Sequence, residues 1–362
     1  MSKIIALNDL YENELEEFII DLGLKKFRAD QIYRAIFSKN IKTIDEITQI
    51  SEKDREILKE KSYIRNLKIL EVFTSKIDKT KKMLYLLEDN TLIEGVLMEY
   101  KHGYTLCVST QVGCRMGCSF CASTVNGMER NLYPSEIVSQ INEVEDYFNI
   151  KISNVVLMGS GEPLDNFDNV IKALRILNSE KGRNLSMRSF TLSTCGVAEK
   201  IVKFGEEIPQ VGLAISVHSF KDEIRSEMMP VNRKYNIDCL FREIRKYAKL
   251  TGNRISIEYT VIPGKNDADE DIRLFKKYLN NLNYIVNLIA LNPINEYNKI
   301  DYRQSAKIFK DKLDKNNINC TLRRELGSDI SASCGQLKKY YLEEGGLSEL
   351  QSSNACGSCS KK

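Results

Sequence analysis

The chain lacks both kinds of segment that direct a protein to a membrane. Its opening residues, Met-Ser-Lys-Ile-Ile-Ala-Leu-Asn-Asp, contain no apolar core like that of a signal peptide. No apolar run approaches the length that a membrane-spanning helix requires. We therefore expect a cytoplasmic protein with no membrane partner.

The chain also has little excess of charge. Its 53 Lys and Arg residues are nearly balanced by 50 Asp and Glu residues, which leaves a net charge of +3 over 362 residues. Such a balance is not by itself typical of an RNA-binding protein. Any RNA must bind through local basic patches, and each patch taken singly is better explained as a solvated surface. The patches are 79–82, 323–324 and 338–339.

Ten cysteines are present, and their spacing is the most informative feature of the sequence. In a reducing cytosol we expect no persistent disulfide, so the thiols are available for metal binding and catalysis. Cys114, Cys118 and Cys121 form the pattern C-x3-C-x2-C. Three thiolates would leave one iron of a [4Fe–4S] cluster open to a small molecule. As a bare pattern, a structural zinc site with a distant fourth ligand fits about equally well.

The apolar patterns predict four consecutive segments. Residues 1–65 read as a small helical domain, with one helix ending at Gly23 and another beginning after an N-cap at Ser51. Residues 66–100 read as strands that include a β-hairpin. From 101 to 345, strands alternate with amphipathic helices, which favours a parallel sheet with outer helices. The serine-rich tail, 346–362, contains Cys356 and Cys359, to which we assign no role.

The expected elements of the third segment are as follows. Strands are predicted at 105–109, 154–158, 189–194, 212–217, 255–261, 286–291 and 319–323. Helices are predicted at 135–148, 167–177, 237–250, 268–279 and 302–313. Cys195, Cys239 and Cys320 are expected to be small buried side chains.

Glycine-containing or polar motifs follow several of these strands. Active sites of such folds lie at the carboxyl ends of the strands. Each motif alone is weak, because strand ends often carry Gly, Ser and Asn in turns. Together they indicate one candidate site, made of Gly159-Ser-Gly-Glu-Pro163, Ser193-Thr-Cys-Gly196, Ser216-Val-His218 and Asn292-Pro293.

With Phe120 just before the third cysteine and Gly161-Glu162-Pro163 downstream, the sequence resembles the radical S-adenosylmethionine (SAM) enzymes. The resemblance implies a partial (β/α)6 barrel and one [4Fe–4S] cluster held by the cysteine triplet, with SAM on the open iron. The residues that match the family's SAM contacts are Gly161, Glu162, Ser193, Ser216, Val217, His218 and Asn292. His218 is one of only two histidines, and we assign it to SAM binding rather than proton transfer.

Three further residues narrow the resemblance. Cys107 precedes the triplet, Cys334 lies near the C-terminus, and Glu94 sits inside the predicted hairpin. Together they resemble the signature of the RlmN/Cfr family of RNA adenosine methyltransferases, and the likeness extends from about residue 10 to Leu337. Without that context, Glu94 is best explained as the solvent face of a hairpin. The resemblance also implies that the helical segment 1–65 helps to hold RNA.

The family's chemistry implies a role for each of these residues. Cys334 takes a methyl group from one SAM, and a second SAM yields a 5′-deoxyadenosyl radical that abstracts hydrogen from that methyl. The resulting radical adds to an adenine carbon, Glu94 removes the ring proton, and Cys107 releases the product by forming a disulfide with Cys334. Ordinary displacement would need a nucleophilic ring carbon, which carbon 2 of adenine is not.

Pro163 and the Ser-Thr-Cys-Gly motif at 193–196 look more like the carbon-2 branch of the family than the Cfr-like carbon-8 branch. That branch implies methylation of an adenosine in the peptidyl-transferase centre of 23S rRNA and of the adenosine 3′ of the anticodon in tRNA. An electron donor such as flavodoxin or ferredoxin is implied, and a monomer is expected. Three alternatives stay open: the carbon-8 enzyme that confers antibiotic resistance, a zinc-stabilised RNA-binding protein, and a radical SAM enzyme with a small-molecule substrate.

Overall fold

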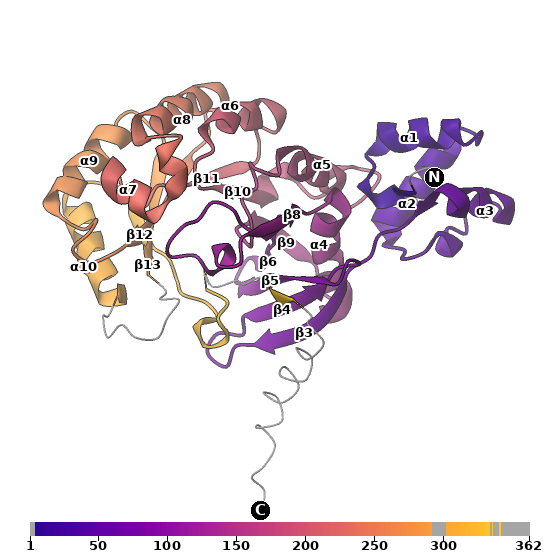
Figure 1. The fold of residues 1–362 in the computed structure, drawn as a ribbon, viewed down its shortest axis with the longest axis horizontal. Coiled ribbons are helices and arrows are strands. Elements are labelled where there is room, and N and C mark those ends of the chain that lie inside the picture. Colours follow the sequence, from indigo (N-terminus) through magenta and orange to yellow (C-terminus); the bar gives the residue numbers. More distant parts are fainter. Residues whose placement is uncertain (1–3, 292–301, 334, 336–339, 342–362) are drawn as a thin grey trace, which may run out of the picture.

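A computed structural model describes residues 4–291, 302–333, 335 and 340–341 (Figure 1). The N-terminal segment forms three helices, α1 (Glu12–Asp21), α2 (Phe27–Lys39) and α3 (Glu52–Lys61), which confirms the predicted helices. The Ser51 hydroxyl accepts a hydrogen bond from the backbone N–H of Asp54 at 3.1 Å, as an N-cap should. Both ends of this unit meet where β1 (Ile5–Ala6) pairs in parallel with β2 (Ser62–Tyr63).

The helical unit lies beside α4 and α5 of the larger part (Figure 1). Ion pairs join the two parts. Lys172 lies 2.6 Å from Glu14, and Lys181 lies 2.9 Å from Glu12. Apolar side chains of both parts also join one continuous core, so the contact is both polar and apolar.

One curved sheet forms the larger part, and its parallel strands follow the chain in order. The order is β14-β13-β12-β11-β10-β9-β6-β5-β4-β3, parallel from β14 to β6. The parallel strands are β6 (Gly103–Cys107), β9 (Ile152–Leu157), β10 (Phe190–Thr194), β11 (Gly212–Ser216), β12 (Ile255–Val261), β13 (Tyr284–Ala290) and β14 (Cys320–Leu322). Because β14 and β6 do not pair in the described sheet, the barrel is open, as the predicted partial barrel requires.

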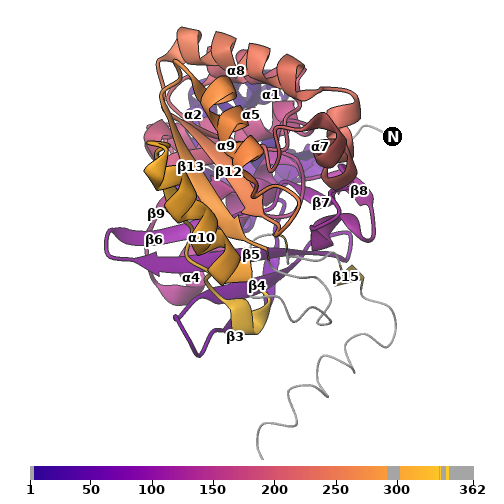
Figure 2. The same ribbon diagram turned by 90° about the vertical axis from the view of Figure 1, so that its left-hand side faces the viewer.

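Helices cover the outer face of this sheet (Figures 1 and 2). They are α4 (Pro134–Phe148), α5 (Phe167–Asn178), α6 (Ala198–Glu207), α7 (Asp222–Met228), α8 (Ile237–Thr251), α9 (Asp269–Leu279) and α10 (Tyr302–Lys315). The helices α6 and α7 were not among those predicted from the sequence. Apolar strand residues such as Leu192 and Ile257 are fully buried, because a parallel sheet is covered on both faces.

An antiparallel extension continues the sheet beyond β6. It consists of β5 (Thr91–Tyr100), β4 (Lys81–Leu86) and β3 (Lys68–Thr74), so the predicted hairpin is confirmed. Asn90, with φ of 65°, turns the chain between β4 and β5. Among the described residues, no helix is both long and apolar enough to span a bilayer.

Candidate active site

A short hairpin that the sequence did not predict holds the cysteine loop. β7 (Gln111–Gly113) pairs with β8 (Met128–Asn131), and the loop runs between them. The backbone N–H of Cys114 donates to the carbonyl of Gly127 at 3.2 Å, and that of Cys121 donates to the carbonyl of Cys118 at 3.1 Å. These bonds fold the loop back over the carboxyl ends of the strands.

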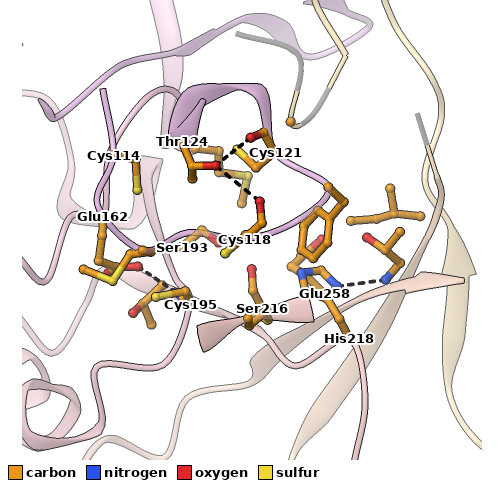
Figure 3. Close-up of a pocket in the computed structure, with 18 of the residues that line it drawn as sticks. Cys114, Cys118, Cys121, Thr124, Glu162, Ser193, Cys195, Ser216, His218 and Glu258 are labelled. Atoms are coloured by element: carbon orange, nitrogen blue, oxygen red, sulfur yellow. Dashed lines mark hydrogen bonds between the residues drawn. The ribbon is translucent and has the colours of Figure 1, made fainter. Parts of the chain in front are cut away.

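The three cysteines line one cavity of about 160 Å³ (Figure 3). Burial raises the pKa of the Cys114 thiol to about 12 and raises that of Cys118 as well. Such thiols are protonated without metal, and a bound cation would favour the thiolates. No three described His, Cys, Asp or Glu side chains stand close enough to hold a metal ion as they are placed. A [4Fe–4S] cluster is larger than a single ion and takes each thiolate on a separate iron, so the three cysteines around the shared cavity still fit a cluster.

Most of the predicted strand-end residues line the same cavity. Gly161, Glu162, Ser193, Ser216 and His218 all face it. Gly161 has φ of 108°, and a Cβ there would come within 2.7 Å of the Gln111 side chain, so only glycine fits.

Two of the predicted contacts are placed differently. Val217 is fully buried, and it is not among the residues that line the cavity. Its backbone N–H donates to the Glu258 carbonyl at 3.1 Å. Asn292 lies outside the described residues, although the neighbouring Leu291 lines the cavity.

The Glu162 carboxylate ties two strand ends together. It accepts hydrogen bonds from the backbone N–H of Cys195 at 2.7 Å and from that of Leu164 at 3.0 Å. Burial raises the pKa of this carboxyl, and the hydrogen bonds from Cys195 act in the opposite direction. The side chain of Glu162 is therefore part of the cavity wall, which leaves the backbone of this segment to meet a ligand.

His218 is a neutral, fixed group at the cavity wall. Its Nδ1 accepts a hydrogen bond from the backbone N–H of Thr260 at 2.9 Å. Burial, together with the charge of Arg225, lowers its pKa to about 3. Phe120 packs edge-on against the imidazole with ring centroids 4.9 Å apart. A histidine held neutral in this way suits binding better than proton transfer.

The strand ends also supply cavity residues that the sequence reasoning missed. Glu258 of β12 accepts hydrogen bonds from Asn287 at 2.8 Å and from Arg323 at 3.2 Å. Its presence inside the apolar run Ile255–Val261 was the available signal. Cys195, expected as a plain buried side chain, is buried but lines the cavity. Cys320 is buried as expected, whereas Cys239 is only partly buried.

A second cavity of about 70 Å³ contains Cys107. Its wall includes Val96 and Met98 of β5 together with Ala332, Ser333 and Gly335. It shares five wall residues with the first cavity, which are Cys121, Met158, Gly159, Arg323 and Gly335. Cys334 itself lies outside the described residues, but both of its chain neighbours line the wall beside Cys107.

Glu94 is buried rather than solvent-facing. Its side chain is 1% exposed, and one carboxylate oxygen lies 3.0 Å from Nζ of Lys82. Because side chains alternate along a strand, Glu94 shares a face of β5 with Val96 and Met98. The carboxylate therefore belongs to the face of the sheet that carries the Cys107 cavity.

Comparisons with known proteins agree with this geometry. A model of the radical SAM superfamily matches residues 108–275. A model of the ribosomal RNA large subunit methyltransferase N-terminal domain matches residues 5–64. Membership of the radical SAM superfamily implies a [4Fe–4S] cluster and SAM as cofactors.

Similarity to individual proteins extends over nearly the whole chain. A probable dual-specificity RNA methyltransferase RlmN from Lachnospira eligens is 44% identical, over 95% of this chain and 98% of that protein. One of the same name from Caldanaerobacter subterraneus subsp. tengcongensis is 46% identical, over 94% and 99%. The crystal structure of a radical SAM methyltransferase from Sphaerobacter thermophilus is 35% identical and matches with a TM-score of 0.84, over 92% of this chain and 99% of that one. The chain therefore belongs to the RlmN family of radical SAM RNA methyltransferases.

Proposed function

We propose that this enzyme methylates carbon 2 of an adenosine in the peptidyl-transferase centre of 23S rRNA and carbon 2 of the adenosine 3′ of the anticodon in tRNA. The observation that carries the proposal is the pair of cavities with a common wall. One cavity contains the cysteine triplet and the strand-end residues, and the other contains Cys107 and the neighbours of Cys334. A methyl carrier between them would reach both cofactor and substrate.

The chain's own residues would hold the cofactors. Cys114, Cys118 and Cys121 would ligate the [4Fe–4S] cluster. The strand ends would bind SAM, of which two are used per turnover, through Gly161, Glu162, Ser193, Ser216, His218 and Asn292, whereas Val217 lies behind the cavity wall. When bound, these cofactors supply the methyl group and the one-electron chemistry that makes it reactive toward carbon.

The remaining steps fall to three side chains. Cys334 carries the methyl group to the adenine, because carbon 2 is no nucleophile and cannot take a methyl from SAM by displacement. Glu94 accepts the ring proton, and its burial on the inner face of β5 keeps water away from it. Cys107 then attacks the Cys334 sulfur, so that the disulfide forms as the carbon–sulfur bond breaks; the released carbon keeps the electron pair and takes up a proton to become the methyl group of the base.

Other parts of the proposal concern partners and place. The helical unit α1–α3 would contact RNA, and a flavodoxin or ferredoxin would supply electrons. We expect a cytoplasmic monomer. In the carbon-8 alternative, the adenine would bind with carbon 8 rather than carbon 2 facing the methyl carrier. Pro163 and the 193–196 motif favour carbon 2. The zinc-stabilised RNA-binding alternative gives no role to Glu94 or to the strand-end residues that line the first cavity.

The test is mass spectrometry of nucleosides from unmodified 23S rRNA and tRNA. The RNA is incubated anaerobically with cluster-loaded enzyme, SAM and a reductant. 2-Methyladenosine as the product supports the proposal. 8-Methyladenosine would show instead that the enzyme methylates carbon 8. A colourless protein that retains stoichiometric zinc and no iron would support the RNA-binding alternative instead.

Variants assign the roles. Cys334→Ala should abolish product, because the methyl carrier is lost. Cys107→Ala should accumulate a covalent protein–RNA adduct, because nothing resolves it. Cys239→Ala is the matched control, since Cys239 is a partly buried cysteine outside both cavities, and it should keep full activity. Full activity in Cys334→Ala would show that Cys334 is not the methyl carrier.

A further inference from the structure

Arg225 is a fully buried arginine whose partners are all neutral. It lies on α7 with 0% exposure. Its guanidinium donates to the carbonyls of Val217 at 3.1 Å, Ser216 at 3.2 Å and Cys195 at 2.7 Å. Its remaining hydrogen bond goes to the side-chain oxygen of Asn232 at 2.8 Å. Within the described part of the chain, the guanidinium forms no ion pair with a carboxylate.

A buried charge with no carboxylate in direct contact is costly. The Asp222 carboxylate acts on it only at a distance, through Asn232, whose amide nitrogen donates to that carboxylate at 2.8 Å. Burial lowers the pKa of Arg225 to about 10, which still leaves the guanidinium protonated at neutral pH. Four hydrogen bonds solvate the group but do not neutralise it. Its positive charge is therefore available to whatever lies on the other side of the cavity wall.

The cysteine loop lies there. The carbonyl of Met228, at the end of α7, accepts a hydrogen bond from the backbone N–H of Ser119, between Cys118 and Cys121. The next residue, Met229, lines the cavity with the three cysteines. Cys195 lines this cavity, and its carbonyl accepts the hydrogen bond from the guanidinium at 2.7 Å, so a single residue separates the charge from the cavity. Arg225 thus faces the same cavity from behind the ends of β10 and β11.

We propose that Arg225 is a positioning residue that favours the reduced state of the cluster electrostatically. The inference rests on the ligand set proposed above. Reduction transfers one electron from a low-potential one-electron donor to the cluster, and no bond forms or breaks. The site becomes one unit more negative, which a fixed cation in a low-dielectric wall stabilises more strongly than water would. Charge near a cluster and its burial are among the factors that set its potential.

A purely structural role predicts something different. If Arg225 served only to tie the ends of β10 and β11, its loss would loosen SAM binding and leave the potential of the SAM-free cluster unchanged. The reduction potential therefore separates the two roles. Charge-removing and charge-keeping variants separate them again, since lysine keeps the cation but not the four directed hydrogen bonds.

The experiment is an EPR-monitored redox titration of cluster-loaded protein without SAM or RNA. Arg225→Met should lower the equilibrium constant for reduction on the order of tenfold, which corresponds to about 59 mV for one electron. Arg225→Lys should stay closer to the wild type than to Arg225→Met. Arg183→Met is the matched control, because Arg183 is 15% exposed but pairs with Glu145 and lines neither cavity. It should leave the potential unchanged.

Should Arg225→Met fail to hold iron, Arg225→Gln gives the same information. It removes the charge but keeps a side-chain amide that can donate to the carbonyls around it, so the potential should again fall. A wild-type potential in a loaded Arg225→Met or Arg225→Gln protein overturns the inference, as does an Arg225→Lys potential as low as that of Arg225→Met. Failure of the proposed function looks different, since the wild type would then bind no cluster or yield no methyladenosine.

Discussion

Gly327 holds the segment that leads to Cys334 against the antiparallel extension of the sheet. Its backbone N–H donates to the Asp78 carboxylate at 2.9 Å. Two residues later, the Asp329 carboxylate accepts from the Ser75 hydroxyl at 2.7 Å and from the backbone N–H of Lys76 at 2.9 Å. The turn between β3 and β4 is therefore the anchor of this segment, and Gly327→Ala is the substitution that should release it.

The size of the effect follows from the geometry. Gly327 has φ of 64°, and a Cβ there would lie 2.7 Å from the Ala332 Cβ and 3.0 Å from the Thr80 side chain. The left-handed conformation costs about 1–2 kcal/mol for alanine, and relieving the overlap costs about 1–3 kcal/mol more. Because 1.4 kcal/mol is a factor of ten, the docked population of the segment should fall at least about tenfold relative to undocked forms.

Two assays check this prediction. Methyladenosine formed per SAM cleaved should fall, because the segment that leads to the proposed carrier is no longer anchored to the extension of the sheet. Tryptic cleavage after the exposed Arg324 should accelerate, because local opening becomes more frequent. The control is Gly252→Ala, since Gly252 has φ of 68° at the C-cap of α8 but nothing within 4 Å of the added Cβ. The reasoning would be refuted if Gly327→Ala changed neither the methyladenosine formed per SAM cleaved nor the rate of tryptic cleavage. It would also be refuted if Gly252→Ala changed both to the same extent.

Three further predictions concern stability. Lys82→Met should destabilise the fold by about 3 kcal/mol, because it breaks a pair with Glu94 in which both side chains are less than 10% exposed. Phe275→Ala should cost about 3–5 kcal/mol, because the ring is fully buried among other aromatic side chains. Glu145 should stabilise the fold above its unfolded pKa of about 4.3, and the contribution should vanish as pH falls through the folded value. Burial alone would raise the pKa of Glu145, but hydrogen bonds from Arg183 and the backbone of Ile152 lower it.

Denaturant unfolding of the three proteins supplies these measurements. The double variant Lys82→Met with Glu94→Gln should recover part of the loss, and no recovery would contradict the account of the pair. Leu250→Ala is the control for Phe275, since Leu250 is 52% exposed. Glu145→Gln should flatten the loss of stability below about pH 4.3, whereas Asp168→Asn, at a side chain that is 92% exposed, should not. If the free energy of unfolding of Glu145→Gln fell with pH as steeply as that of the wild type, the predicted contribution of Glu145 would be contradicted.

Local sequence patterns predicted most of the helices and strands. The N-terminal helices, the hairpin of β4 and β5 and the parallel strands were readable because each depends on a periodicity within a short window. The helices α6 and α7 were not predicted; α7 has only seven residues, whereas α6 has ten, as many as α1 and α3, so length does not explain its omission. The hairpin of β7 and β8 escaped because its strands enclose the cysteine loop and pair across it.

The sequence by itself was enough to predict the family. The C-x3-C-x2-C triplet with Gly161-Glu162 resembles the radical SAM enzymes, and Glu94, Cys107 and Cys334 narrow that resemblance, whereas the triplet alone fits a zinc site about equally well. Only the tertiary structure decided what surrounds them. Glu94 is paired with Lys82 inside the sheet, Glu162 braces two strand ends, and Arg225 stands behind the cysteine loop. These contacts join strands and helices that are far apart in the chain, and their strength depends on burial. No local sequence pattern could therefore reveal them.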